Sequence, residues 1–145
     1  MVNSLAFYVT LLRRQFVDYC NQRLQELGLS QGLLFFIIYV GKHPGCSPKE
    51  LAENLQMDTG HAARSLAKLE QAGFLRQSPN PCDKRSHLLN LTGRGQEAFR
   101  VSHELFFLWD QELMCEMSQE DRENLLGLLE RLTRSSRSGR GEKEV

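Results

Sequence analysis

The sequence predicts a mostly helical fold that contains one small β-hairpin. Apolar residues recur every three or four positions along most of the 145 residues, which is the spacing of one helical face. In the middle of the chain, two short helical segments are joined by only a few residues. Two strand-like segments follow them around a loop that contains prolines. With 41% hydrophobic and 25% charged residues, the chain has the composition of a soluble fold that buries a core.

The first two predicted helices are strongly apolar. Over residues 5–27 apolar side chains cover much of the girth of the helix, so we expect it to be buried on more than one side. Gly28 is predicted to end this helix. A second helix is predicted over residues 30–40, before Gly41 and Pro44.

Two shorter helices follow in the middle of the chain. Ser47 and Pro48 are predicted to be the N-cap and the first residue of a helix over residues 48–55. Asp58 is the next predicted N-cap, and that helix is expected to end at Gly73. Two short helices with a tight link form the helix-turn-helix pattern.

The predicted hairpin consists of residues 74–77 and 87–91, joined by an irregular loop that holds Pro79 and Pro81. The predicted hairpin directly follows the helix-turn-helix. A helix-turn-helix that is followed by a β-hairpin, the wing, is a winged helix, and this is the architecture that we expect for the middle of the chain.

Two more helices are predicted after the hairpin. Thr92 caps a long helix to about Met117, and Ser118 with Asp121 has the spacing of a capping box before the last one. The polar, Ser- and Gly-rich end of the chain is predicted to be disordered. The sequence is thereby divided into N-terminal helices (1–40), a winged helix-turn-helix domain (41–95), C-terminal helices (96–134) and a tail (135–145).

The charge is unevenly distributed along a chain whose formal net charge is zero. Residues 42–94 contain eight Lys or Arg and five Asp or Glu, whereas residues 96–133 contain three and nine. A basic segment beside an acidic one is expected of a protein that presents one face to a polyanion. A net charge of zero does not exclude DNA binding, because only the face near the phosphates matters.

Several motifs occur at fixed spacing between residues 47 and 95. They are Glu50-Leu51-Ala52, Arg64, Leu66, Leu69, Gly73 and Leu75, then Asp83-Lys84-Arg85 as D-x-R, and Leu91-Thr92 with Gly95 as L-T-x-x-G. In this order they resemble the winged-helix core of the MarR (multiple antibiotic resistance regulator) family. The chain departs from the usual family pattern at Ala63, where a Thr or Ser often precedes the recognition-helix arginine.

The resemblance implies a bacterial, cytoplasmic transcription regulator that binds double-stranded DNA at a near-palindromic operator. It implies a homodimer whose dimerisation domain consists of the first helix and the last two helices of both subunits. It also implies a repressor of its own or a neighbouring operon, released by a small aromatic or lipophilic ligand. Neither enzymatic activity nor a cofactor is implied.

The predicted recognition helix carries the main candidate contacts. His61, Arg64 and Lys68 project from one side of it, and Arg64 can reach guanine O6 and N7, or a phosphate, in a major groove. Backbone N–H groups at the start of the helix attract a phosphate. The full set of candidate DNA contacts is Ser47, Lys49, Thr59, Gly60, His61, Arg64, Ser65, Lys68, Lys84 and Arg85.

In the wing, Arg85 is best placed to reach a minor groove. Asp83 is expected to orient the wing by pairing with an arginine, because phosphates would repel its carboxylate. The candidate effector-pocket residues are Phe16, Tyr39, His43 and Phe106, with ordinary core packing as the alternative interpretation.

Other functions are less well supported by the sequence. The four cysteines form no C-x-x-C pair, and we expect no metal site and no disulfide framework. Residues 93–98 match G-x-G-x-x-A, but no strand follows to form the βαβ unit of a dinucleotide site. No catalytic motif is present, and the longest apolar run would span only about 12 Å as a helix, so no membrane partner is expected. Two alternatives stay open: a thiol-redox switch at Cys82, and a winged helix that serves only as a protein-interaction module.

Overall fold

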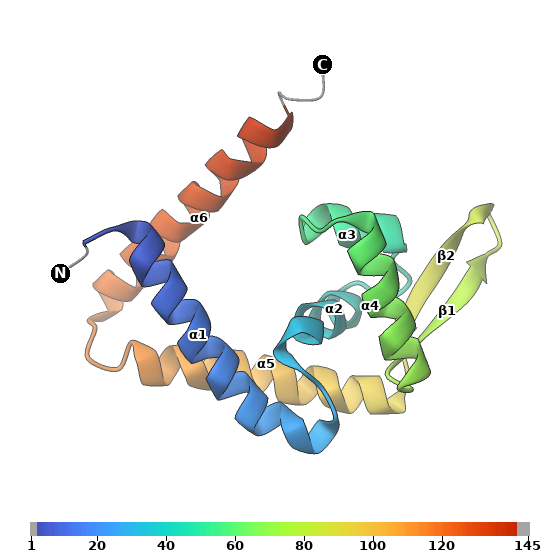
Figure 1. Cartoon of the computed structure of the whole chain (residues 1–145), viewed down its shortest axis with the longest axis horizontal. Coiled ribbons are helices and arrows are strands. Elements are labelled where there is room, and N and C mark those ends of the chain that lie inside the picture. The colour runs from blue at the N-terminus through green and yellow to red at the C-terminus, as the bar shows by residue number, and fades with distance from the viewer. Residues whose placement is uncertain (1–2, 142–145) are drawn as a thin grey trace. The chain divides into compact units, whose positions relative to one another are not determined.

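The computed structural model describes residues 3–141, apart from the side chains of residue 31 and residues 135–141. Helices dominate the fold and one antiparallel hairpin interrupts them, which confirms the predicted fold class (Figure 1). The elements are α1 (Leu5–Leu24), the 3₁₀-helix η1 (Gln25–Leu27), α2 (Gln31–Lys42), α3 (Pro48–Asn54), α4 (Thr59–Gln71), β1 (Leu75–Asn80), β2 (Asp83–Leu91), α5 (Gly93–Leu113) and α6 (Gln119–Gly141).

The chain divides into two compact units, residues 1–109 and residues 110–145. The first unit contains the helix-turn-helix α3–α4, the hairpin and most of α5. The second contains the end of α5 and the whole of α6. No single helix in the described part of the chain is long and apolar enough to span a membrane; residues 5–27 and 32–42 meet the length and composition requirement only as a pair bent by 71°.

The helix boundaries follow local signals in the sequence. Ser47 and Asp58 accept hydrogen bonds at the starts of α3 and α4, from the backbone N–H of Glu50 at 3.1 Å and of His61 at 3.0 Å. Thr92 and Ser118 cap α5 and α6 in the same way. The predicted stops at Gly28 and Gly73 also hold, since these residues have φ of 73° and 85°, a conformation that glycine adopts without steric cost. The predicted stop before Gly41 is wrong, because α2 continues through Gly41 to Lys42.

The core lies beneath α4 and the hairpin. Ala62, Leu66 and Leu69 of α4 are buried, as the helical spacing predicts, and the polar side of α4 stays exposed. Their buried companions come from every other element of the first unit except η1: Leu24 of α1, Phe36 and Ile37 of α2, Leu51 of α3, Leu75 of β1, Leu89 of β2 and Ala98 of α5. This packing fixes which face of α4 can meet a partner.

The hairpin is longer than the sequence predicts. The expected irregular loop around Pro79 is paired strand, with Pro79 opposite His87, and the hairpin turn is confined to residues 81–82. Proline removes a backbone donor, but in a two-stranded sheet each strand has a free edge, so no interior ladder is broken. Because proline is rare in strands, the sequence predicts that the first strand ends at residue 77, and this boundary is wrong.

The last two helices also differ in length from the prediction. α5 ends at Leu113, four residues before Met117, because Met114 and Met117 form a turn before the Ser118 cap. α6 continues to Gly141, so residues 135–141 of the predicted tail are helical. No proline stands in this segment to stop a helix, and residues 142–145 lie outside the described residues.

Candidate nucleic-acid interface

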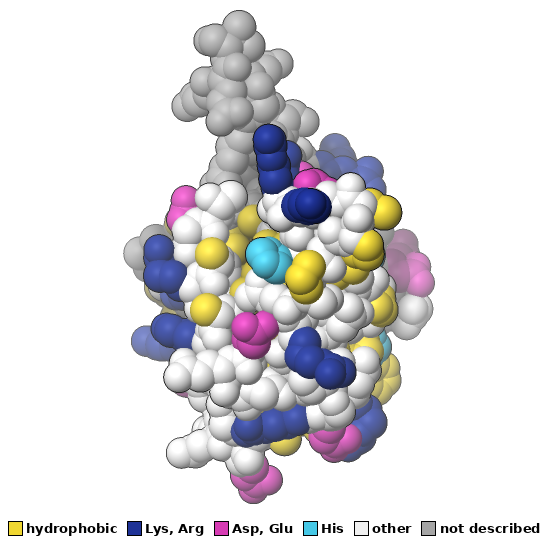
Figure 2. Space-filling view, turned by 90° about the vertical axis from the view of Figure 1, so that its right-hand side faces the viewer, with side chains coloured by type: hydrophobic (Ala, Val, Ile, Leu, Met, Phe, Trp, Pro, Cys, Tyr) yellow, Lys and Arg dark blue, Asp and Glu magenta, His cyan; other side chains and the backbone are white. Residues whose placement is uncertain are grey.

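The exposed side of α4 carries three of the predicted contacts. His61, Arg64 and Lys68 are all exposed, since the buried residues of the helix face the other way. Figure 2 looks onto the side on which β1 and β2 lie in Figure 1, and it shows several Lys and Arg side chains and a histidine on this face. The side chains that we expected on one helix face are therefore brought together on an open surface.

The Arg64 guanidinium folds back over the first turn of α4. A Cβ placed on Gly60 would lie 3.2 Å from Arg64 Nη1 and 3.1 Å from Asp58 Oδ2, so a larger residue at this position would crowd both groups. Asp58 is engaged as the N-cap, and the described residues form no ion pair with Arg64. Its charge is thus free for a partner with negative charge or exposed acceptors.

The remaining predicted contacts on the helices have different surroundings. The His61 ring lies 6.3 Å from the Phe36 ring, centroid to centroid, in an edge-on arrangement that orients it. Thr59 and Lys49 are exposed, while Gly60 and Ser47 are half-buried. The prediction that Ser65 contacts DNA is wrong. Ser65 is only 5% exposed and faces the core, so it does not belong to the interface.

The wing presents its basic residues through an irregularity in β2. The register shifts between Pro79 and Asn80, whose partners are His87 and Asp83, so residues 84–86 of β2 lie opposite no residue of β1. Such a bulge bends a strand and redirects its side chains. Lys84 and Arg85 both lie in it and are exposed.

Asp83 shapes the wing, although it does so through a different group from the one we expected. Its Oδ1 accepts a hydrogen bond from the backbone N–H of Arg85 at 3.0 Å, whereas the sequence suggested an arginine side chain. On the other side of the turn, Asn80 Oδ1 accepts from the Cys82 N–H at 2.9 Å. Short side chains that bond to the backbone two residues ahead stabilise such turns.

Glu70 ties the recognition helix to the wing, and sequence reasoning missed it. The backbone N–H of Gln77 in β1 donates to Glu70 Oε2 at 2.7 Å. An acidic residue in the last turn of a helix is unfavourable for the helix dipole, and this was the available signal that Glu70 has another partner. The bond fixes β1 against the end of α4, so the two candidate DNA-binding elements are held together.

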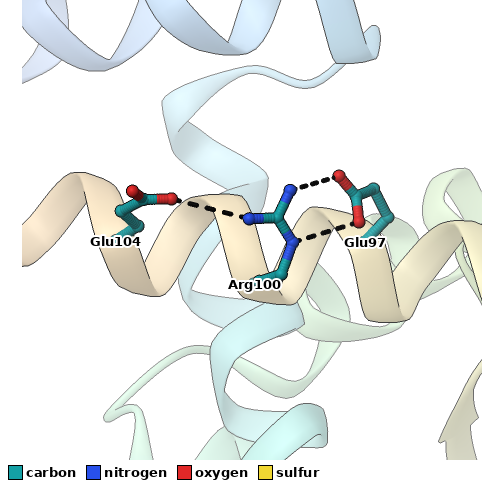
Figure 3. Close-up of polar contacts among 3 residues, drawn as sticks. All are labelled: Glu97, Arg100 and Glu104. Atoms are coloured by element: carbon teal, nitrogen blue, oxygen red, sulfur yellow. Dashed lines mark hydrogen bonds and ion pairs between the residues drawn. The ribbon is translucent and has the colours of Figure 1, made fainter.

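Ion pairs among the described residues lie elsewhere in the chain. On α5, Arg100 contacts Glu97 at 2.6 Å and Glu104 at 3.6 Å (Figure 3), and α6 has a pair between Arg134 and Glu130. The Arg100 guanidinium lowers the pKa of the Glu97 carboxyl through its hydrogen bond and charge. By contrast, the cations of α4 and the wing face solvent without carboxylate partners in the described structure.

The four candidate effector residues separate into two groups. Phe16 and Phe106 pack with their ring centroids 5.5 Å apart, and Phe35 and Trp109 complete this aromatic cluster of α1, α2 and α5. Tyr39 instead lies against His43, at 4.5 Å, and its hydroxyl accepts a hydrogen bond from Asn54 at 3.1 Å. The sequence did not predict the contributions of Phe35 and Trp109.

A cavity of about 570 Å³ lies apart from those residues. It is lined by Asp18, Asn21, Gln22, Gln25, Leu29 and Ser30, on α1 and the segment after it. Five of these six residues are polar and none is aromatic, so the cavity does not correspond to the predicted aromatic pocket. Among the described residues, no group of three His, Cys, Asp or Glu could hold a metal ion.

The cysteines fall into buried and exposed pairs. Burial raises the pKa of both the Cys20 and the Cys46 thiols to about 11, so these thiols are protonated at neutral pH. Cys82 and Cys115 are exposed, and none of the four forms a disulfide. Cys82 lies in the hairpin turn, within reach of solvent.

Comparison with known proteins identifies the family. A model of the MarR family matches residues 29–87. The HTH-type transcriptional regulator BilQ of Clostridium symbiosum is 42% identical over 132 residues, which cover 91% of this chain and 92% of that protein. The chain belongs to the MarR family. It is accordingly a transcription regulator with a DNA-binding fold, and it is not an enzyme.

Solved structures show the same MarR fold. A crystal structure of MarR superimposes with a TM-score of 0.84 at 24% identity and covers 98% of each chain. The S. aureus MepR–DNA complex gives a TM-score of 0.85 at 18% identity, over 92% of this chain and 99% of the other. A mutant MarR from E. coli in complex with operator DNA gives 0.79 at 25% identity, over 88% and 92%.

Proposed function

We propose that this MarR-family protein is a homodimeric repressor that binds a near-palindromic operator. In this proposal α4 enters the major groove and the hairpin turn reaches the adjacent minor groove. The observation that carries it is the set of exposed cations on α4 and in the β2 bulge. The Glu70–Gln77 bond holds these elements together, and no carboxylate among the described residues neutralises the cations. Two of the structurally similar proteins are in complex with DNA, one of them with operator DNA, which supports DNA as the partner.

The residues of the interface have distinct roles in this proposal. Arg64 has a free planar guanidinium in the first half of α4 and reads a guanine edge in the major groove. Lys68 and Lys49 bind phosphates, which positions the protein without reading sequence. Arg85 enters the minor groove, where negative potential is strongest if the groove is narrow.

Selection from a random pool of duplexes tests this function. We expect near-palindromic sequences whose half-sites lie one helical turn or a multiple of it apart, since a two-fold dimer presents two recognition helices. The same protein should bind scrambled duplex weakly and with a strong dependence on salt. A chain that binds no duplex at low salt would instead be a winged helix used only for protein interactions.

Exposed apolar side chains in both units support dimerisation. α1 exposes Leu5, Phe7, Tyr8, Val9 and Leu12, and α6 exposes Leu126, Leu128, Leu129 and Leu132. Apolar surface of this extent is typical of an interaction site. The chain is expected to sediment as a dimer of about twice 16.7 kDa, and deletion of residues 1–27 should make it insoluble. A well-behaved monomer at micromolar concentration would contradict the proposed assembly.

The aromatic cluster supports release by a small ligand. Phe16, Phe35, Phe106 and Trp109 come from three helices and present ring edges and faces suited to an aromatic or lipophilic molecule. A ligand that inserts among them would shift α1, α2 and α5, and with them the base of the DNA-binding elements. Repression would take place in the cytoplasm, where the operator DNA lies.

The wing gives a prediction about salt dependence. Arg85→Ala is expected to weaken binding to operator and scrambled duplex to a similar degree and to reduce the salt slope by about one unit. Asp83→Ala should reproduce part of this loss, because the turn that presents Arg85 is no longer held. Asp83→Asn is the matched control, since it keeps an oxygen that can accept the Arg85 N–H. Titrations at several salt concentrations measure this effect, and an Arg85→Ala protein with unchanged binding would show that the wing does not reach DNA.

A further inference from the structure

Arg94, the second residue of α5, connects three parts of the first unit. Its Nη1 donates a hydrogen bond to the carbonyl of Ala72 at 2.5 Å, and its Nη2 donates to the carbonyl of Leu27 at 3.2 Å. The guanidinium carbon lies 4.2 Å from the centroid of the Phe74 ring. One side chain therefore contacts the last residue of η1, the C-cap residue of α4 and the residue that precedes β1.

The two carbonyls occupy equivalent positions at helix ends. Leu27 precedes Gly28 and Ala72 precedes Gly73, and both glycines have positive φ, at 73° and 85°. The last carbonyls of a helix lack partners within it and carry partial negative charge, so a cation is favourable there. A guanidinium has five N–H donors in a rigid fork and can bind two such ends at once, whereas a lysine ammonium cannot match this geometry.

These contacts separate Arg94 from the DNA-binding cations. Its donors are directed at protein carbonyls, and its plane lies over the Phe74 ring, which is only 1% exposed. Arg94 belongs to the basic segment 42–94 and its side chain is exposed, yet its guanidinium is engaged by two backbone carbonyls and the Phe74 ring. A contact to phosphate would require it to give up these bonds.

Thr92 forms two further hydrogen bonds that hold the start of α5 against the segment after α4. Thr92 Oγ1 donates to the Gly73 carbonyl at 2.5 Å, and the Thr92 N–H donates to the Phe74 carbonyl at 3.0 Å. Arg94 adds a hydrogen bond from the start of α5 to Leu27 in η1, which directly follows α1. The recognition helix is thereby tied to the end of the first helix as well as to α5.

We propose that Arg94 is a positioning residue for DNA recognition, which sets the orientation of α4 relative to the end of the first helix. This inference rests on the proposed function, because it matters only if α4 must meet a groove in a fixed orientation. In a two-fold dimer, a small rotation of α4 in each subunit misplaces both recognition helices against their half-sites. Sequence-specific binding is then weakened while the phosphate contacts remain.

The test compares Arg94→Ala with Arg100→Ala on a duplex selected from a random pool and on its scrambled version. Arg100 is a matched control, because it lies on the same helix and forms only exposed pairs with Glu97 and Glu104 (Figure 3). Arg94→Ala is expected to bind the selected duplex about tenfold more weakly, the cost of about one mismatched base pair. Its binding to scrambled duplex and its salt slope should stay unchanged, and Arg100→Ala should match the wild type on both duplexes.

Two results would overturn the proposal. If Arg94→Ala weakens both duplexes equally and lowers the salt slope by about one unit, Arg94 contacts a phosphate. If the folded variant binds the selected duplex as the wild type does, Arg94 does not position α4. Arg94→Lys keeps the charge but cannot bind both carbonyls, so it serves if the alanine variant does not fold. Wild-type affinity in Arg94→Lys would equally overturn the proposal.

Hydrogen exchange of the free protein tests the Arg94 contacts to the two helix ends in the absence of DNA. Arg94→Ala is expected to speed amide exchange both at residues 25–29 and at residues 70–74, since one guanidinium holds both ends. Arg100→Ala should speed neither, and faster exchange at only one end would contradict the shared contact. A wild-type chain that binds no duplex would overturn the proposed function, and this measurement would then still decide whether Arg94 joins the two helix ends.

Discussion

Replacement of Gly95 by alanine is expected to lower the free energy of unfolding by about 3 kcal/mol or more, at the upper end of the cost of overpacking. A Cβ on Gly95 would lie 1.9 Å from the Phe74 carbonyl oxygen and 3.0 Å from the Leu91 Cβ. The carbonyl belongs to the backbone and is held by the Thr92 N–H at 3.0 Å, so it cannot move aside like the tip of a side chain. The start of α5 would have to separate from Phe74, the residue that precedes β1.

Gly93→Ala is the matched control for this prediction. Gly93 lies in the same first turn of α5, but a Cβ there would meet nothing within 4 Å. Alanine is favoured over glycine in helices, so this change should be neutral or slightly stabilising. Urea unfolding followed by circular dichroism measures both variants, and equal stabilities would show that the approach of α5 to Phe74 is not tight.

The starts of α3, α4, α5 and α6 could be predicted because their signals are local. Caps such as Asp58 and Thr92 act on backbone groups within three residues, so the sequence alone displays both partners. Gly95 was recognisable as part of a motif, but the reason for it, a backbone atom 21 positions earlier in the chain at Phe74, appears only in the folded structure.

Features that depend on distant parts of the chain could not be predicted in the same way. Glu70 and Arg94 resemble ordinary charged helix residues in the sequence, and their partners are known only once the strands and helix ends are placed. Ser65 is a candidate DNA contact by sequence because it follows Arg64, but it is only 5% exposed, and this is decided by how far the core extends around α4. The hairpin extends through Pro79 because the sheet has only two strands, and the number of strands is not visible in the sequence.

Replacement of Arg64 by alanine is expected to remove base discrimination of about 1–3 kcal/mol, the value of a bidentate contact to guanine. The guanidinium is exposed above the first turn of α4 and has no carboxylate partner in the described structure. Operator affinity should therefore fall by about tenfold to a hundredfold, and affinity for scrambled duplex should fall much less. Titration of both duplexes at one salt concentration measures the difference.

Two comparisons make this result specific. Arg100→Ala should bind both duplexes as the wild type does, because its exposed pairs lie on α5. Lys68→Ala should weaken both duplexes alike, since an ammonium on phosphate carries no sequence information. An Arg64→Ala protein that loses the same affinity for both duplexes would show that Arg64 binds phosphate and that specificity resides in another residue.

In the proposed complex, α4 lies in the major groove of duplex DNA. Methylation interference on a selected duplex tests this placement, because methylation of guanine N7 blocks the major-groove edge and leaves the phosphates intact. We expect interference in two patches that lie one helical turn or a multiple of it apart, and loss of the interfering guanine in each patch when Arg64 is replaced by alanine. Undiminished binding to fully N7-methylated duplex would contradict it.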